Sequence, residues 1–373
     1  MSWVNKYKLS AIETIKYHDQ QCLNINDLWN ALHSTFNMAL HRQVDIDILN
    51  EITNKPTSLW PFFSKEEFRL ILSSCNNSSV PSPDKLTWSH LKIIPKDDEC
   101  LNIIIHITNA CIELGYWPLH FKRFTTIVIP KPNKKLFRPI VLLNTVGKLI
   151  EKVIGERLQF NTTSNNFIYP SQLSSLKFKS TIDVGIALTH IIRAEWTKNM
   201  STSTLAFDIS QFFPSLNHQL LTLIMKKVGF NNHVVSFFVN YLVDRKTNYY
   251  WNNFMSPIFN VNVGVGQGFV LSPILSALYL SLFIYILENH LKNLKIPVFI
   301  ISFVDNGLFI SQSNSFDISN SQLYCSYNVL TNLLEKFGLV VEHSKTEIFH
   351  FNRSYGSFNP PYLNLSPLGG NIL

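Results

Sequence analysis

The sequence predicts an α+β fold. Its 373 residues are 46% hydrophobic and 13% aromatic, enough apolar side chain for a sizeable core and for more than one packed substructure. Short runs of β-branched and aromatic residues, typical of strands, alternate with longer segments of helical apolar spacing. The clearest strand signal is residues 298–312, where apolar residues on both sides flank the pair Asn306-Gly307.

Charge favours a polyanionic partner. Only 15% of the residues are charged, but 32 lysines and arginines exceed 25 acidic residues, giving a formal net charge of +7. This surplus suits nucleic acid without identifying it. The five cysteines contain no Cys-x-x-Cys pair, so neither a disulfide scaffold nor a zinc site is indicated and a reducing compartment is expected. The first residues lack the apolar region of a signal peptide, which predicts an intracellular protein.

The first part of the chain, residues 1–79, is expected to be a helical extension. Residues 25–41 have helical apolar spacing, and a second short helix is expected over residues 68–72. Ser64, followed three residues later by Glu67, forms a possible capping box for that helix. Neither segment carries a recognisable chemical motif.

Breaker-rich residues 80–84 form a loop, after which helices are predicted over residues 88–94 and 101–114. Gly115 and then Pro118 should end the second helix.

A basic segment follows between two short strands. The first strand covers residues 125–130, and the second leads to Leu143 before a helix over residues 144–158. The basic residues of the segment are Lys131, Lys134, Lys135 and Arg138. The segment is either a solvated loop or a phosphate clamp, for which lysine and arginine are chemically suited.

An acidic residue stands at the end of an apolar strand. Residues 203–207 form the strand, Asp208 ends it, and the chain then turns into a helix. Asp208 either serves that turn or is held rigidly at the end of a sheet. Phe212 lies one helical turn beyond, so that both side chains can face one cavity.

Alternating glycines precede a long apolar run. Gly264, Gly266 and Gly268 either let the backbone approach a ligand or have an ordinary structural role. The uncharged run over residues 270–287 has the lower-limit length of a membrane span. Pro273, its serines and the absence of a flanking basic cluster favour a buried helix, and no membrane is expected.

A second acidic residue stands in the hairpin over residues 298–312. Asp305 is at its tip and is either a turn-former or a rigidly held metal ligand. A carboxylate on a neighbouring strand, as expected for Asp208, favours the second interpretation. Beyond the hairpin, residues 330–339 should be helical, and Lys345 lies near the start of a last strand.

Taken in order, these segments resemble a reverse transcriptase of the non-long-terminal-repeat (LINE-type) retrotransposon type. The resemblance extends from about Asp84 to Gly370 and rests on an ordered set of motifs. The matching segments are Arg138-Pro139-Ile140, Leu142-Leu143-Asn144, Asp208 with Phe212, Gly266-Gln267-Gly268, Leu271-Ser272-Pro273, Phe303-Val304-Asp305-Asn306, Phe337-Gly338-Leu339 and Lys345-Thr346-Glu347.

The resemblance implies a role for each matched residue. Asp208 and Asp305 correspond to the metal-binding aspartates, and Phe212 to the aromatic gate that screens the sugar 2′ position. The remaining matches are Gln267 and Gly268 in the template-and-nucleotide motif, Lys131 and Arg138 as holders of the triphosphate, and Lys345 as a candidate proton donor.

The resemblance also implies fold, cofactors and partners. Residues 80–202 would form the fingers and residues 203–373 a right-hand polymerase palm, an antiparallel sheet backed by helices. Two Mg²⁺ or Mn²⁺ ions are expected, because nucleotidyl transfer uses paired cations and hard cations prefer carboxylate oxygen. RNA template, DNA primer and deoxynucleoside triphosphates are the expected partners, in the nucleus or the cytoplasm. The oligomeric state is not predicted.

Several residues depart from the family pattern. Asn306 stands where a second aspartate is usual, and the lost charge weakens attraction for a divalent ion by on the order of several kcal/mol. Phe269 replaces the usual serine and should crowd the nucleotide pocket, and Ser174 and Ser175 stand where glycine is typical. The thumb is expected to be absent or incomplete. Weak polymerase activity is therefore predicted; the alternatives are an inactive remnant that binds nucleic acid and, more distantly, a membrane protein.

Overall fold

The computed structural model describes residues 15–17, 20–22, 24–77, 84–130, 137–174, 179–353, 363–364 and 371–372. The chain forms two compact units, each assembled from separated segments. Unit 1 comprises Met1–His41, Asn54–Phe160 and Phe213–Ser272, and unit 2 comprises Arg42–Thr53, Asn161–Phe212 and Pro273–Leu373. This division follows packing, so the functional boundaries expected at residues 79 and 202 remain predictions.

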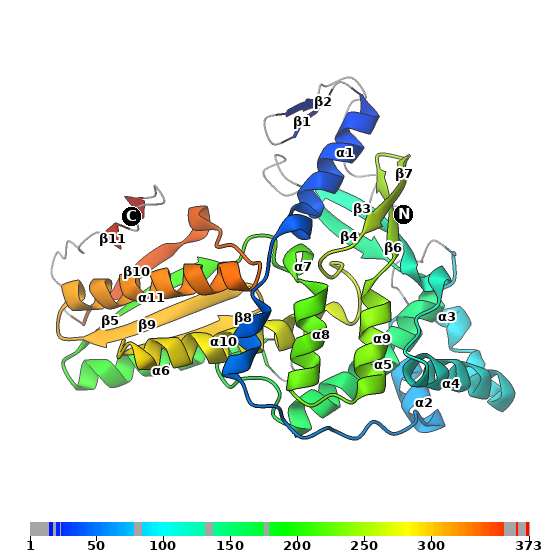
Figure 1. The fold of residues 1–373 in the computed structure, drawn as a ribbon, viewed down its shortest axis with the longest axis horizontal. Helices are drawn as coiled ribbons and strands as arrows, with labels where there is room; N and C mark the ends of the chain where they lie inside the picture. Colours follow the sequence, from blue (N-terminus) through cyan, green and yellow to red (C-terminus); the bar gives the residue numbers. More distant parts are fainter. Residues whose placement is uncertain are drawn as a thin grey trace. The chain divides into compact units, whose positions relative to one another are not determined.

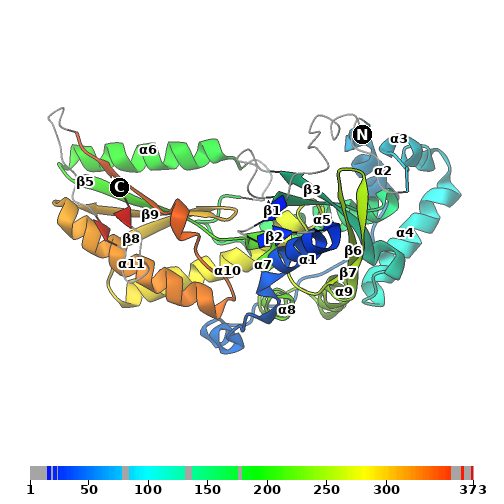
Figure 2. The same cartoon turned by 90° about the horizontal axis from the view of Figure 1, so that it is seen from above.

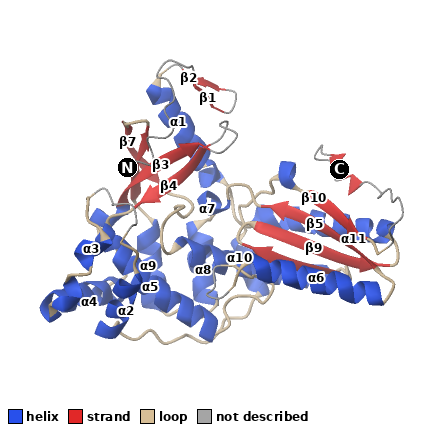
Figure 3. Ribbon diagram, turned by 180° about the vertical axis from the view of Figure 1, so that it is seen from behind, coloured by secondary structure: helices blue, strands red, loops and turns tan. Residues whose placement is uncertain are grey.

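Unit 1 contains a four-stranded sheet in the order β4-β3-β6-β7, drawn in red in Figure 3. Its strands are β3 (Arg123–Pro130), β4 (Phe137–Leu142), β6 (Arg245–Trp251) and β7 (Phe254–Val261). β3 pairs antiparallel with β4 and parallel with β6, and β6 pairs antiparallel with β7. β3 and β4 confirm the strands predicted around the basic segment, of which residues 131–136 lie outside the described residues.

The helices assigned within unit 1 have the predicted end signals in two cases, described below. They are α1 (Ile25–Phe36), α2 (Lys65–Ser74), α3 (Trp88–Leu91), α4 (Asp98–Glu113), α8 (His218–Lys227) and α9 (Asn232–Leu242). The capping box of α2 is confirmed: the Glu67 amide donates to Ser64 Oγ at 3.3 Å, and the Ser64 amide donates to Glu67 Oε2 at 2.8 Å. Gly115 ends α4 with φ +58°, the left-handed conformation that glycine adopts without strain.

Among the described residues, three helices run across the division between the units, α5 (Thr145–Ser164), α7 (Phe212–Ser215) and α10 (Ser272–Asn293). The short 3₁₀ helices are Met38–His41, Ile46–Glu51, Ile94–Lys96, Leu119–Lys122 and His343–Lys345. Two small antiparallel pairs complete the assigned elements, β1 (Ile15–Tyr17) with β2 (Gln20–Cys22) and β11 (Leu363–Asn364) with β12 (Asn371–Ile372).

Unit 2 is built on an antiparallel sheet in the order β10-β5-β9-β8. The strands are β5 (Ser201–Asp208), β8 (Val298–Phe303), β9 (Asn306–Ser313) and β10 (Glu347–Phe351). Helices α11 (Phe316–Lys336) and α6 (Thr181–Thr197) run along opposite sides of this sheet, α11 on the near side in Figure 1 and α6 on the far side (Figures 1 and 2). Unit 2 therefore has the antiparallel sheet backed by helices that was predicted for the palm.

The long apolar run of the sequence forms helix α10 (Ser272–Asn293). By length and composition alone this helix could cross a membrane, but 78% of its most apolar 18-residue window is buried inside the protein. Its Tyr279 hydroxyl donates to the Phe337 carbonyl at 2.6 Å, and Phe283 packs edge-on against the Phe337 ring at 5.3 Å. The prediction of a buried helix is confirmed.

Helix α11 is longer than predicted, because it begins at Phe316 where the sequence indicated residues 330–339. Its first half is rich in serine and asparagine, which have low helix propensity. These residues are buried by polar contacts instead, since Ser313 Oγ lies 2.7 Å from Ser319 Oγ and Ser311 Oγ donates to Gln322 Oε1 at 2.6 Å. A polar interface of this kind leaves no apolar periodicity in the sequence.

Candidate active site

Backbone pairing in unit 2 brings the two acidic segments together. In the β5–β9 ladder Asp208 lies directly opposite Asn306. The Ile209 amide then donates to the Asp305 carbonyl at 3.0 Å. The two predicted metal ligands are therefore held by neighbouring strands of one sheet, which fixes their backbones more firmly than a loop could.

The hairpin turn lies at Val304-Asp305, because Phe303 pairs with Asn306. The prediction that Asn306-Gly307 forms the turn was therefore wrong by two residues. Val304 has φ +56° and Asp305 has no positive φ, the sign pattern of a type II′ hairpin turn. A β-branched residue in the left-handed region is strained. The backbone is therefore strained at the residue that precedes Asp305.

Gly307 has a packing role in β9. It pairs with Phe207 of β5, and a Cβ atom at position 307 would overlap the Phe207 ring. Phe207 in turn packs on Phe309 at a centroid distance of 5.3 Å. Glycine is therefore required at position 307 by the aromatic core behind the acidic residues, and this requirement produced the misleading Asn-Gly turn signal.

Lys345 lies beside Asp208. It ends the 3₁₀ helix His343–Lys345, and its ammonium donates a hydrogen bond to Asp208 Oδ2. The same segment is fixed to β5, since the Glu342 amide donates to the Asp208 carbonyl at 2.8 Å. The hydrogen bond to Asp208 raises the pKa of Lys345, an effect that burial opposes and that Glu342 and Asp305 reinforce through their charges.

The side chains at this site suit a hard divalent cation, but together they carry little negative charge. Asp208 and Asp305 supply carboxylate oxygens, which Mg²⁺ and Mn²⁺ prefer. The Lys345 ammonium already contacts Asp208, and Asn306 Nδ2 donates to Asp305 Oδ1 at 3.3 Å. Within the described ranges no cluster of three or more histidine, cysteine or acidic side chains could hold a metal. Asp208 and Asp305 are therefore the carboxylates here whose chemistry fits a divalent cation.

Phe212 begins α7, three residues after Ile209, which forms an isolated bridge with Val341. Gln211 before it has φ +46°, which turns the chain sharply from strand to helix. The Phe212 side chain is 2% exposed, so almost none of its ring can be reached from solvent in this conformation. Its role as an aromatic gate remains a prediction.

The other predicted nucleotide-binding residues that are described belong to unit 1. Arg138 is exposed on β4, the strand whose Val141 amide donates to the Gln267 carbonyl at 2.7 Å. Gly268 has φ +114°, and a Cβ atom there would lie 2.7 Å from the Val141 carbonyl oxygen. The Gln267-Gly268 loop is thus fastened to the strand that carries Arg138. Lys131 lies outside the described residues.

Phe269 is buried in this structure, and its expected crowding of the nucleotide pocket remains a prediction. Its side chain is 4% exposed and packs edge-on against Phe124 at 5.2 Å and near Tyr241 at 6.3 Å. Burial of the apolar ring determines where this side chain lies, although the residue is next to Gly268 in sequence. Ser174 is also fully buried, and Ser175 lies outside the described residues.

Sequence reasoning missed a buried carboxylate behind the glycine loop. Glu151 of α5 accepts from the Tyr241 hydroxyl at 2.7 Å and from the Val270 amide at 3.0 Å. Burial raises its pKa to about 7, against the lowering effect of these two hydrogen bonds and of nearby Lys148 and Arg245. The available signal was its spacing, because Glu151 falls on the same helical face as Ile154 and Leu158.

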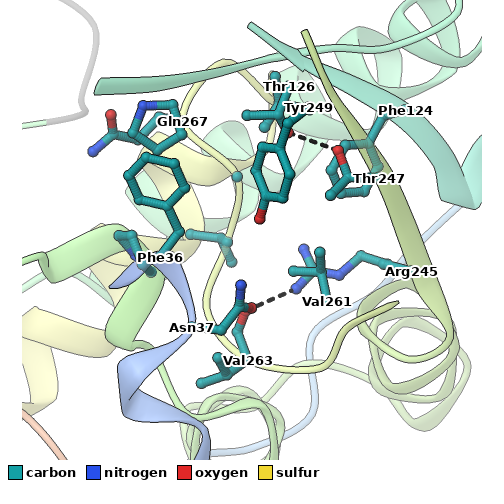
Figure 4. A pocket seen from close by; sticks show the side chains of 15 residues that line it. Phe36, Asn37, Phe124, Thr126, Arg245, Thr247, Tyr249, Val261, Val263 and Gln267 are labelled. Atoms are coloured by element: carbon teal, nitrogen blue, oxygen red, sulfur yellow. Dashed lines mark hydrogen bonds between the residues drawn. The ribbon is translucent and has the colours of Figure 1, made fainter. Parts of the chain in front are cut away.

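A cavity of about 50 Å³ lies within unit 1 (Figure 4). Phe36 and Asn37, Arg245, Thr247 and Tyr249 of β6, and Gln267 are among the residues that line it. Arg245 Nη1 and Asn37 Oδ1 are buried without a hydrogen-bond partner among the described residues. Ordered water is the usual partner of such atoms, and the cavity has room for it. Nothing in the sequence around Arg245 marked it as buried.

Known proteins resemble this chain over the region that holds these motifs. The sequence profile of the family described as reverse transcriptase (RNA-dependent DNA polymerase) matches residues 129–366. The probable RNA-directed DNA polymerase from transposon X-element of Drosophila melanogaster is 26% identical over 251 residues, 65% of this chain and 27% of that protein. The RNA-directed DNA polymerase from mobile element jockey of the same species is 25% identical over 58% of this chain and 24% of that protein.

The chain thus spans about a quarter of the length of these relatives. Among solved structures, apo telomerase from Candida tropicalis, truncated from its C-terminal domain, aligns over 63% of this chain and 51% of that chain. The TM-score is 0.48 and the sequence identity 17%. The family profile covers well over half of the sequence and includes Arg138, Asp208, Gln267, Asp305 and Lys345. This chain belongs to the reverse transcriptase (RNA-dependent DNA polymerase) family.

Proposed function

We propose that the chain is the polymerase domain of a non-long-terminal-repeat retrotransposon and that it extends a DNA primer on an RNA template. In this reaction the primer 3′-oxygen attacks the α-phosphorus of a deoxynucleoside triphosphate, and the bond to the bridging oxygen breaks to release pyrophosphate. The observation that carries the proposal is the β5–β9 register, which sets Asp208 beside the turn that presents Asp305.

Asp208 and Asp305 would hold Mg²⁺ or Mn²⁺, with two ions expected from the family. When bound, such ions lower the pKa of the primer hydroxyl and neutralise charge on the triphosphate. Lys345 would give a proton to the departing pyrophosphate, a role supported by its ammonium contact with Asp208 and by the 59% exposure of its side chain. Arg138 and Lys131 would bind the triphosphate, with Gln267 and Gly268 at the nucleotide and Phe212 screening the sugar.

The asparagine at position 306 is the reason to expect slow catalysis. A carboxylate at this position would add a unit negative charge directly opposite Asp208, and the amide supplies none. At about 4 Å and an effective dielectric constant of about 20, the lost attraction for a divalent ion is on the order of several kcal/mol before desolvation is subtracted. The same observation favours a second candidate function, binding of RNA or RNA–DNA hybrid without catalysis.

Primer extension by the purified chain tests the proposal. The substrates are a DNA primer on an RNA template, all four deoxynucleoside triphosphates and Mn²⁺. We expect slow extension that Asp208→Asn reduces at least about 100-fold, because one of two carboxylate ligands becomes neutral. Asp317→Asn is the matched control, since Asp317 is an exposed acidic residue at the start of α11. It should leave the rate unchanged.

Binding of the same primed template, measured by fluorescence anisotropy, separates the two candidates. Binding with no extension above the Asp208→Asn background would favour the non-catalytic function. Failure of the folded protein to bind the template at all would contradict both.

A further inference from the structure

The cation beside Asp208 belongs to the protein itself. Lys345 places its ammonium on Asp208 Oδ2, and the Asp208 side chain is only 12% exposed. Asp208 therefore already has a positively charged partner at the position where a polymerase of this family needs carboxylate oxygen for a metal. A divalent cation can use that oxygen only if the ammonium moves away.

Lys345 is anchored at its backbone, while its side chain is largely exposed. The Lys345 amide donates to the Glu342 carbonyl at 3.0 Å, and the Glu342 amide donates to the Asp208 carbonyl at 2.8 Å. The Glu342 carboxylate is held on both sides, by Ser344 Oγ at 2.7 Å and Ser210 Oγ at 3.1 Å. Because the Lys345 side chain is 59% exposed, its ammonium can swing into solvent without any change in the sheet.

The number of carboxylates beside the Lys345 ammonium determines how strongly the ammonium competes with a metal ion. With an asparagine at position 306, the β5 and β9 ends offer two carboxylates, Asp208 and Asp305, and the ammonium cancels half of their charge. An aspartate at position 306 would supply a third carboxylate, against which one lysine would compete poorly. The internal cation therefore matters more in this chain than it would with the usual pair of aspartates.

We propose that Lys345 is a tethered counter-cation that competes with divalent metal for Asp208 and so sets the metal concentration at which the site fills. This inference rests on the proposed function only for the identity of the ligand, a divalent cation. When metal binds, the ammonium is displaced toward solvent and becomes available near the leaving pyrophosphate. Lys345 thus pairs with Asp208 until a divalent cation replaces it there.

The strength of the ion pair predicts how far Lys345 weakens metal binding. Ion pairs with an exposed partner are worth up to about 1 kcal/mol, which is about a fivefold change in an equilibrium constant. Lys345→Met keeps an unbranched side chain that is one atom shorter and removes the ammonium. We therefore expect Lys345→Met to tighten Mn²⁺ binding about fivefold.

Mn²⁺ binding to the full chain tests the proposal, with free Mn²⁺ measured by electron paramagnetic resonance in the absence of nucleotide and template. Lys336→Met is the matched control, because Lys336 pairs with Asp45 at 3.6 Å elsewhere in unit 2 and is 49% exposed. It should leave Mn²⁺ affinity unchanged. Asp208→Asn should weaken binding and, combined with Lys345→Met, should abolish the fivefold gain. Circular dichroism confirms that each variant is folded.

Each outcome bears on the proposal. Equal or weaker Mn²⁺ binding by Lys345→Met would overturn it, as would a gain that persists beside Asp208→Asn. If the wild type binds Mn²⁺ through Asp208 but Lys345→Met does not tighten binding, the counter-cation is wrong and the proposed polymerase site stands. If neither protein binds Mn²⁺ in a way that depends on Asp208, the metal site of the proposed function is wrong as well.

Discussion

At position 306 an asparagine lies opposite Asp208, and the next residue, Gly307, lies against the Phe207 ring. The family resemblance identified Asp208 and Asp305 as partner metal ligands, and the sequence pattern had left each open between a turn role and a metal site. That pattern placed the turn at Asn306-Gly307, since this dipeptide is the strongest short hairpin signal. What decided the true turn was an aromatic ring 100 residues away in the chain, which no local pattern reveals.

The contact at Gly307 predicts the effect of a single methyl group. Gly307→Ala should lower the free energy of unfolding by about 1–3 kcal/mol, because its Cβ would overlap the buried Phe207 ring. Gly185→Ala is the matched control, since no atom lies within 4 Å of a Cβ at that position of α6. It should stabilise the protein by up to about 1 kcal/mol through helix propensity.

Urea denaturation followed by circular dichroism measures both changes. A Gly307→Ala variant as stable as the wild type would mean that the β5–β9 sheet is packed differently from the structure described.

Elements with strong local signals were predicted well. The capping box at Ser64 fixed the start of α2, Gly115 fixed the end of α4, and uninterrupted apolar character identified α10. Helix α11 was predicted too short because its first half packs through serine and asparagine. The parallel pairing of β3 with β6 was not predicted, since the two strands are separated by more than 100 residues and pairing across such a distance depends on the whole fold.

The position of Phe269, in the loop that follows β7, also could not be predicted from local sequence. Its position beside Gln267 and Gly268 suggested contact with nucleotide, but the ring is buried near Phe124 and Tyr241. Phe269→Ser should therefore lower the free energy of unfolding by about 3–5 kcal/mol, the cost of a large cavity.

Phe254→Ser is the matched control for Phe269→Ser, because Phe254 is also in unit 1 and is 55% exposed. It should change stability by less than about 1 kcal/mol. Chemical denaturation measures the stability of both variants. Increased primer extension by a fully stable Phe269→Ser protein would support the expectation that Phe269 crowds the nucleotide pocket.

At the scale of the whole molecule, composition and motif order predicted more than any single element did. A net charge of +7 favoured a polyanionic partner, and the ordered motifs indicated the family that the profile over residues 129–366 shows. The motifs are short segments in different units, with Asp208 and Asp305 in unit 2 and Arg138 and Gln267 in unit 1. The Lys345 contact with Asp208 could not be predicted, because it depends on how the chain after α11 returns to β5.

We propose that this chain has the polymerase site of its family with one carboxylate missing. The rate of primer extension on an RNA template by Asn306→Asp, relative to the wild type, tests it most directly, with Asn314→Asp in the exposed segment before α11 as the matched control. We predict that Asn306→Asp raises the rate at least about tenfold, about 1.4 kcal/mol of transition-state stabilisation, and that Asn314→Asp does not change it. An Asn306→Asp protein that folds and binds the primed template but extends it no faster than the wild type would contradict the claim.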